Sequence, residues 1–175
     1  MSNRGMKYNV LFLGSGNAAR SIMAEAILRR DGGEKFQAYS AGLHAKEALD
    51  PHAAELLRRA GFDIAVLRPQ NWNELAGDDG VRFDFIFTVC DNAMLLPRSM
   101  WPGRPLFAHW GVANPAMTRA GVAEIRCAYS DTFRILANRV GMFTALALAS
   151  LDRPALQREL DLIGSSRDKA VVAAA

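Results

Sequence analysis

The chain has 175 residues, of which 50% are hydrophobic and 22% are charged. This length and composition predict one globular domain with a sizeable core and exclude a globally disordered chain. The net charge of +3 suits an anionic ligand, but the basic residues are too few and too evenly spread to predict a nucleic-acid partner.

Location and metal content are constrained by what the sequence lacks. Two distant cysteines, Cys90 and Cys127, form no disulfide framework, which favours a reduced, cytoplasmic protein. The polar stretch at 1–7 has no apolar core of a signal peptide, and the apolar runs at 10–13 and 140–151 are too short to cross a membrane. Because these runs are short, we expect no membrane partner. No set of His, Cys and Asp residues has metal-ligand spacing, so we expect no metal, and we also expect no cofactor.

The first ordered stretch predicts an anion site. An apolar run at 9–13 has the length of a buried strand, residues 14–19 are all Gly, Ser, Ala or Asn, and a helix is expected over 19–30. Such a loop at a helix N-terminus forms a cradle of backbone N–H groups, and the Arg20 guanidinium suits a tetrahedral oxyanion such as phosphate, sulfate or arsenate. The predicted anion-binding residues are Gly14, Ser15, Gly16, Asn17, Ala18, Ala19, Arg20 and Ser21.

The remaining elements predict an α/β fold. Strands and helices are expected to alternate: strands at 36–40, 83–89 and 105–109, helical turns at 71–75 and 91–95, and helices at 50–61, 121–149 and 154–163. This order predicts a three-layer α-β-α domain with a four-stranded parallel sheet and right-handed crossovers. We expect a single domain over 1–163 and a flexible tail at 164–175, with the ligand site at the carboxyl ends of the strands.

The glycine loop also matches a second class of anion site. Gly14-x-Gly16-x-x-Ala19 fits the dinucleotide-binding fingerprint G-x-G-x-x-G/A. That fingerprint requires an acidic residue at the end of the second strand to hold a ribose, and the Ser-Ala-Gly motif at 40–42 offers no carboxylate. A dinucleotide-binding module is therefore an alternative that has the glycine loop of the fingerprint but lacks its acidic residue.

Residues 11–26 closely resemble the phosphate loop of the low-molecular-weight tyrosine phosphatases, and most of all that of their relatives, the thioredoxin-linked arsenate reductases. The resemblance covers roughly residues 7–145. It continues in the family's order through the motifs at 40–42, 50–54, 88–91 and 109–116. It implies the family's fold, no cofactor, and an inorganic oxyanion or a phosphorylated protein as partner.

Three departures from the family's pattern make the chain resemble a degenerate member. The family's loop is Cys-x5-Arg-Ser, and Gly14 stands where its cysteine nucleophile would be. Asn114 replaces the aspartic acid that protonates the leaving group in the phosphatases, and an amide donates no proton at useful pH. Cys90 matches the first of two further cysteines that pass a disulfide outward in the reductases, whereas Leu96 stands at the second.

These losses remove negative charge while Arg20 and Ser21 remain, so we expect a pseudoenzyme that binds oxyanions or phosphorylated proteins. Two alternatives stay open. The loop can be a relic that serves only as a packed turn, or the protein can be an active reductase or phosphatase that uses an outside thiol such as glutathione.

Three further residues are assigned roles. By resemblance, the loop that carries Trp110 and Asn114 covers the anion site, which makes both candidates for a lid and Asn114 the degenerate acid, although packing is the favoured interpretation of Trp110. Cys90 is a redox candidate, although a small buried residue at a strand end is the favoured interpretation. The amphipathic helix at 154–163 can dock on the domain or join two copies of the chain as a homodimer.

Overall fold

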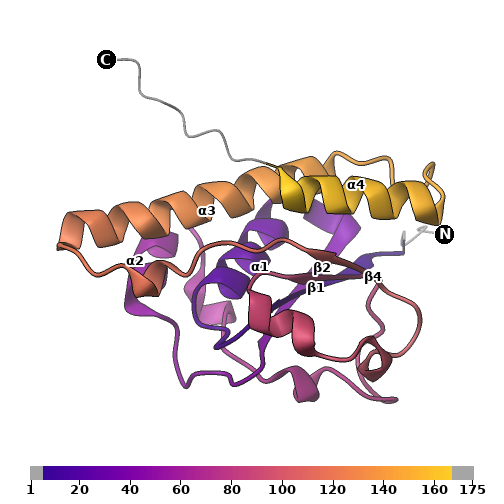
Figure 1. Cartoon of the computed structure of the whole chain (residues 1–175), viewed down its shortest axis with the longest axis horizontal. Coiled ribbons are helices and arrows are strands. Elements are labelled where there is room, and N and C mark those ends of the chain that lie inside the picture. Colours follow the sequence, from indigo (N-terminus) through magenta and orange to yellow (C-terminus); the bar gives the residue numbers. More distant parts are fainter. Residues whose placement is uncertain (1–5, 167–175) are drawn as a thin grey trace.

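The computed structural model describes residues 6–166. Its sheet is parallel and has the strand order β2-β1-β3-β4. The strands are β1 (Tyr8–Gly14), β2 (Phe36–Gly42), β3 (Phe85–Thr88) and β4 (Leu106–His109). The α-helices are α1 (Arg20–Asp31), α2 (Pro51–Arg59), α3 (Val122–Thr144) and α4 (Arg153–Ser165) (Figure 1). The four-stranded parallel sheet predicted from the sequence is confirmed.

The two faces of the sheet are covered by different kinds of structure. Along β1, Val10 and Phe12 join a core cluster with the α-helices, whereas Leu11 and Leu13 point to the opposite face. That second face is covered by loops and 3₁₀ turns, which lie across the sheet from α3 and α4 in Figure 1. These turns are η3 (Trp72–Glu74), η4 (Asp91–Leu95) and η5 (Arg98–Met100).

Local sequence explains where α2 begins, whereas packing decides where α3 ends. The Asp50 carboxylate caps α2 by accepting hydrogen bonds from the N–H groups of His52 and Ala53, with Pro51 at the first helical position. The long helix α3 ends at Thr144, earlier than the expected 149, because the chain turns there and buries Leu148 in the core. No helix within residues 6–166 is long and apolar enough to span a membrane.

The C-terminal boundary also differs slightly from the prediction. Helix α4 continues to Ser165, two residues beyond the expected end of the domain at 163. Leu156, Leu160 and Ile163 form the apolar face of α4, and all three are buried against the rest of the domain. The rest of the expected tail, from residue 167, lies outside the described residues.

Trp110 is a core residue, which corrects the expectation that it forms a lid. Its side chain has no exposed surface, its ring stacks on that of Phe87 with a centroid distance of 3.8 Å, and its indole N–H donates to the Leu160 carbonyl at 3.1 Å. The reason is strand alternation: Leu106, Ala108 and Trp110 share one side, and that side faces the α-helices. The alternation was readable in the sequence.

A Trp110→Ala variant tests this assignment. Because truncating a buried aromatic residue removes burial and leaves a cavity, we expect the free energy of unfolding to fall by about 3–5 kcal/mol. Urea denaturation measures the change, with the half-buried Trp72→Ala as a control that should lose less. A loss within about 0.5 kcal/mol, typical of surface residues, would contradict the core assignment.

Candidate functional site

The loop at residues 14–19 connects the carboxyl end of β1 to α1, and the segment after β2 binds its carbonyl oxygens. The carbonyls of residues 14, 15 and 16 accept hydrogen bonds from the backbone N–H groups of Leu43, His44 and Lys46 at 3.1, 2.9 and 2.9 Å. The Ala18 carbonyl accepts one from the Asp50 N–H at 2.9 Å. Within the described part of the chain, by contrast, no backbone N–H of residues 15–19 donates a hydrogen bond.

This loop encloses a small polar cavity. The cavity has a volume of about 130 Å³ and is lined by all eight residues of 14–21, together with Lys46, Asp50, Asn114 and Ala116. The structure therefore gathers every residue that the sequence assigned to the anion-binding loop. Because donor groups without partners surround the cavity, its surface suits an anion with several acceptor oxygens.

Helix α1 adds its dipole to the same cavity. The helix begins at Arg20, its N-cap residue Ala19 provides no side-chain cap, and no acidic residue lies in its first turn. The positive end of the helix is thus left without a compensating side chain. An anion in the cavity would supply that compensation.

Arg20 is held at the cavity by a hydrogen bond from its Nη1 to the Val112 carbonyl at 2.9 Å. Burial lowers the pKa of the Arg20 guanidinium, and the nearby Cys90 and Asp91 partly offset that effect. The guanidinium of an arginine nevertheless keeps its proton in proteins. Arg20 is therefore a cation with a restricted position.

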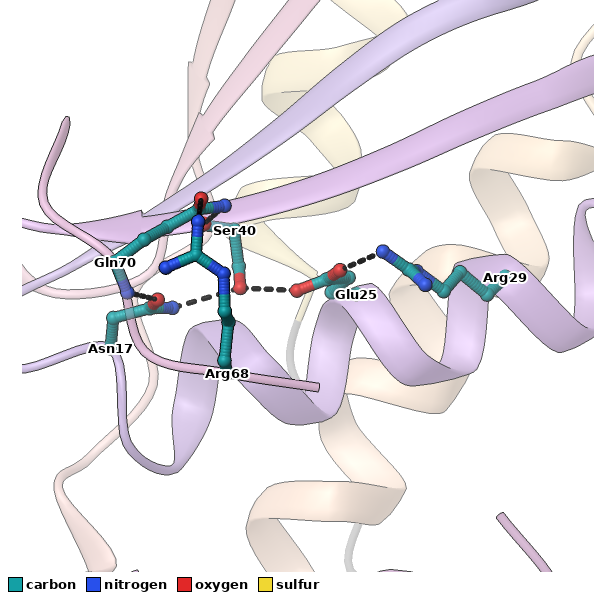
Figure 2. Close-up of polar contacts among 6 residues, drawn as sticks. All are labelled: Asn17, Glu25, Arg29, Ser40, Arg68 and Gln70. Atoms are coloured by element: carbon teal, nitrogen blue, oxygen red, sulfur yellow. Dashed lines mark hydrogen bonds and ion pairs between the residues drawn. The ribbon is translucent and has the colours of Figure 1, made fainter. Parts of the chain in front are cut away.

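The shape of the loop depends on Asn17, which adopts a left-handed backbone conformation with φ of 48°. Its side-chain amide donates to the hydroxyls of Ser21 and Ser40 at 2.9 and 2.8 Å, and its carbonyl accepts from the Gln70 N–H at 2.9 Å. Figure 2 shows the contacts of Asn17 with Ser40 and Gln70, which come from separate segments of the chain. The three hydrogen bonds offset the cost of the left-handed conformation.

Sequence analysis did not assign Glu25 and Gln70 to the site, yet both belong to the hydrogen-bond network that holds Asn17. The Ser40 hydroxyl donates to the buried Glu25 carboxylate, which pairs with Arg29 at 2.6 Å (Figure 2). The Gln70 side chain donates to the Ser40 carbonyl at 2.8 Å. A carboxylate on the apolar side of the helix at 20–31 was a visible signal for Glu25, whereas nothing in the sequence pointed to Gln70.

Gly42 permits the close approach of β2 to the loop. A Cβ at this position would lie 2.8 Å from the Ser15 carbonyl oxygen and 2.9 Å from the Asn17 nitrogen, distances that real side chains do not adopt. The glycine therefore belongs to the site although it contributes no side chain to it. Lys46 and Asp50, which line the cavity, were also not assigned to the site from the sequence.

The other predicted site residues lie at different distances from the cavity. Asn114 is part of the lining, and its side-chain oxygen accepts a hydrogen bond from the Ala116 N–H at 3.2 Å. Cys90 is buried behind the loop, where its Sγ lies 3.1 Å from the Ser15 Oγ. Within residues 6–166, no group of three or more His, Cys, Asp or Glu side chains could hold a metal ion.

Gly14 is the last residue of β1 and lines the cavity where the loop begins. A Cβ built on Gly14 would be 3.0 Å from the Ser21 Oγ and 3.4 Å from its Cβ. A side chain at this position would therefore rest against the Ser21 hydroxyl. As a glycine, residue 14 contributes only backbone atoms to the cavity lining.

Comparisons with known proteins agree with the resemblance seen in the motifs. A family model described as low molecular weight phosphotyrosine protein phosphatase matches residues 9–143. The arsenate reductase of Bacillus licheniformis is 33% identical over 129 residues, which cover 73% of this chain and 88% of that protein. The arsenate reductase of Bacillus subtilis is 32% identical over 126 residues, or 71% of this chain and 86% of that protein.

Solved structures share the fold. The arsenate reductase of Archaeoglobus fulgidus aligns with a TM-score of 0.57 and 31% identity over 75% of this chain and 98% of its own. A low molecular weight protein tyrosine phosphatase from T. tengcongensis aligns with a TM-score of 0.62 and 23% identity over 77% of this chain and 96% of its own.

The buried carboxylate behind the loop predicts a specific pH dependence of stability. Burial raises the pKa of Glu25 above its ordinary 4.5, and the Ser40 hydrogen bond and Arg29 partly oppose this effect. Since the folded-state pKa is the higher one, the stabilisation that Glu25 provides is complete below pH 4.5 and is lost as pH rises through the raised pKa. A difference of one in pKa between the folded and unfolded states corresponds to about 1.4 kcal/mol of stability.

A Glu25→Gln variant tests this dependence. We expect the free energy of unfolding of the wild type, relative to the variant, to fall as pH rises from about 4 to about 7. Urea denaturation at several pH values measures it, with the exposed Glu34→Gln as the matched control. Parallel pH profiles of the wild type and Glu25→Gln would show that Glu25 has the same pKa in both states.

Proposed function

Because the chain belongs to the low molecular weight phosphotyrosine protein phosphatase family, we propose that the loop at 14–21 binds an oxyanion, inorganic or on a phosphorylated protein, without turning it over. The observation that carries the proposal is the set of N–H groups at residues 15–19. Within the described chain they have no hydrogen-bond partner, and they surround the cavity at the N-terminus of α1. An anion in the cavity would accept hydrogen bonds from these donors, and hydrogen bonds to charged groups contribute about 1.5–3 kcal/mol.

The residues at positions 14 and 114, where the family has its nucleophile and its acid, support binding without turnover. Gly14 offers no atom that can attack a phosphorus or arsenic centre, and the Asn114 amide cannot protonate a leaving group. The same changes remove negative charge from the neighbourhood of the anion. Two like charges about 4 Å apart repel by roughly 1–4 kcal/mol in surroundings between water and a protein surface, so the loop is expected to hold its anion more firmly than a loop with a thiolate.

Titration of the protein with phosphate and with arsenate tests anion binding. We expect micromolar to low-millimolar affinity that falls roughly 10–100-fold in Arg20→Ala, because hydrogen bonds to charged groups contribute about 1.5–3 kcal/mol. Isothermal calorimetry measures the affinity. The control is Arg58→Ala, which removes the same charge from an exposed position on α2.

The control separates a specific site from a general effect of net charge. Equal losses in the two variants would indicate non-specific attraction to a basic protein. No heat with either anion in the wild type would favour the alternative in which the loop is a relic that only packs.

One observation favours a second candidate, an enzyme that relies on another thiol. The Cys90 Sγ lies 3.1 Å from the Ser15 Oγ, so a sulfur is present directly behind the loop. In this alternative, a reductase or phosphatase reaction would depend on an added thiol or on Cys90. It differs from pure binding in a measurable way, since only turnover releases product.

Turnover of p-nitrophenyl phosphate distinguishes the candidates, because its leaving group departs without a general acid. For a pure binder we expect no product from the wild type, with or without glutathione or thioredoxin. A Gly14→Cys variant, whose thiol would rest against Ser21, should gain roughly 10²-fold or more, well below the ~10⁶ that a nucleophile contributes in an intact site. The gain should vanish in Gly14→Cys combined with Arg20→Ala.

Thiol-dependent turnover by the wild type, lost in Cys90→Ser or in Arg20→Ala, would instead establish the second candidate. The same assay with arsenate, followed by the appearance of arsenite, covers the reductase reaction.

A further inference from the structure

The residues that line the cavity include an aspartate, Asp50, which is unexpected in a site for anions. Asp50 is half-buried and lines the same cavity as the free N–H groups of the loop. Its backbone is tied to the loop through the hydrogen bond from its N–H to the Ala18 carbonyl at 2.9 Å. An ionised carboxylate repels an anion and offers only acceptor oxygens, so its presence restricts which anions can bind.

Several contacts hold the Asp50 side chain in place. Its Oδ1 accepts hydrogen bonds from the N–H groups of His52 and Ala53 at 2.9 and 3.2 Å, as the cap of α2. Burial raises the pKa of Tyr129 of α3, and the nearby Asp50 carboxylate adds to this effect. The carboxylate therefore cannot move from this position without losing its two hydrogen bonds to the first turn of α2.

Positive groups in the lining balance this carboxylate. Arg20 is one, and Lys46 is the other: its Cγ, Cδ and Cε atoms lie within 3.6 Å of where a Cβ on Gly16 would be. With two cations, the end of α1 and one carboxylate, the cavity remains favourable for an anion. It presents many donors and a single strong acceptor.

On this arrangement, and assuming that the loop binds anions as proposed above, we propose that Asp50 selects oxyanions that carry a proton. Hydrogenphosphate and hydrogenarsenate can donate an O–H to the carboxylate, which turns a repulsion into a charge-assisted hydrogen bond. Sulfate and selenate carry no proton at neutral pH, so the Asp50 carboxylate repels them and no hydrogen bond offsets the repulsion. The class of ligand is therefore inorganic phosphate or arsenate.

The same reasoning separates inorganic anions from phosphorylated proteins. A phosphomonoester has a second pKa near 6, so above pH 7 most of its phosphate groups are dianions with no proton to donate. Inorganic phosphate and arsenate retain at least one proton under the same conditions. The pocket therefore favours the free anion over the phosphoryl group of a protein.

Two matched pairs of anions test the inference by isothermal calorimetry at pH 7.5: phosphate against sulfate, and arsenate against selenate. Within each pair the two ions are similar tetrahedra that differ mainly in the proton. For the wild type we expect the protonated member of each pair to bind at least about tenfold more tightly, equivalent to about 1.4 kcal/mol. Phenyl phosphate should also bind more weakly than inorganic phosphate.

Asp50→Asn removes the charge while keeping a residue that caps helices as well as aspartate does. In this variant we expect the preference within each pair to fall about tenfold, chiefly through tighter binding of sulfate and selenate. Serine is also a good uncharged N-cap, so Asp50→Ser should lose the preference within each pair as Asp50→Asn does. The matched control is Asp152→Asn, which alters the capping aspartate of α4 and should leave the preferences unchanged.

The outcomes separate this inference from the proposal on which it rests. Binding of all four anions with equal affinity in the wild type, or an unchanged preference in a folded Asp50→Asn, would overturn selection by Asp50 and leave anion binding intact. No binding of any of the four anions would overturn both.

Discussion

The hydrogen bonds between the loop at 14–19 and the segment that follows β2 determine the character of the site. A peptide unit carries its N–H and C=O on opposite sides, so a segment that takes up four carbonyl oxygens of the loop leaves the N–H groups available elsewhere. Gly42 makes this possible, because any side chain there would collide with the Ser15 carbonyl. The proposed anion-binding surface thus originates in contacts made on the other side of the loop.

The polar network formed by Asn17, Ser40 and Glu25 helps to hold the loop in the same conformation. A left-handed asparagine and a buried glutamate are both unfavourable by themselves, yet Asn17, Ser40 and Glu25 form one connected set of hydrogen bonds. Burial raises the pKa of Glu25 although Arg29 is nearby, which indicates that the desolvation of this carboxylate is not fully compensated. We interpret the network as a local cost in stability that keeps the loop in a conformation open to an anion.

Loss of reactive groups and retention of binding groups are physically separable in this fold. The donors of the cavity come from the backbone and from Arg20, which depend on the sheet and on α1, whereas nucleophile and acid are single side chains at 14 and 114. Exchanging those two side chains leaves the hydrogen bonds that shape the loop unaltered. Under the proposed function, this chain has lost its chemistry and kept its ligand, and the proposed role of Asp50 is to limit which anions bind.

The sequence alone was sufficient for the order and type of the elements, the parallel sheet and the eight loop residues, because hydrophobic periodicity, capping residues and small-residue loops are local signals. One tertiary result was readable but was not read: the alternation at 106, 108 and 110 points Trp110 into the core, although its motif had suggested a lid. Only the tertiary structure brought Lys46, Asp50 and Gln70 to the loop, and only it turned the loop carbonyls away from the cavity. Those contacts join residues that lie 29 to 53 positions apart in the sequence, and the direction of a carbonyl or the charge inside a cavity depends on how the segments meet in space.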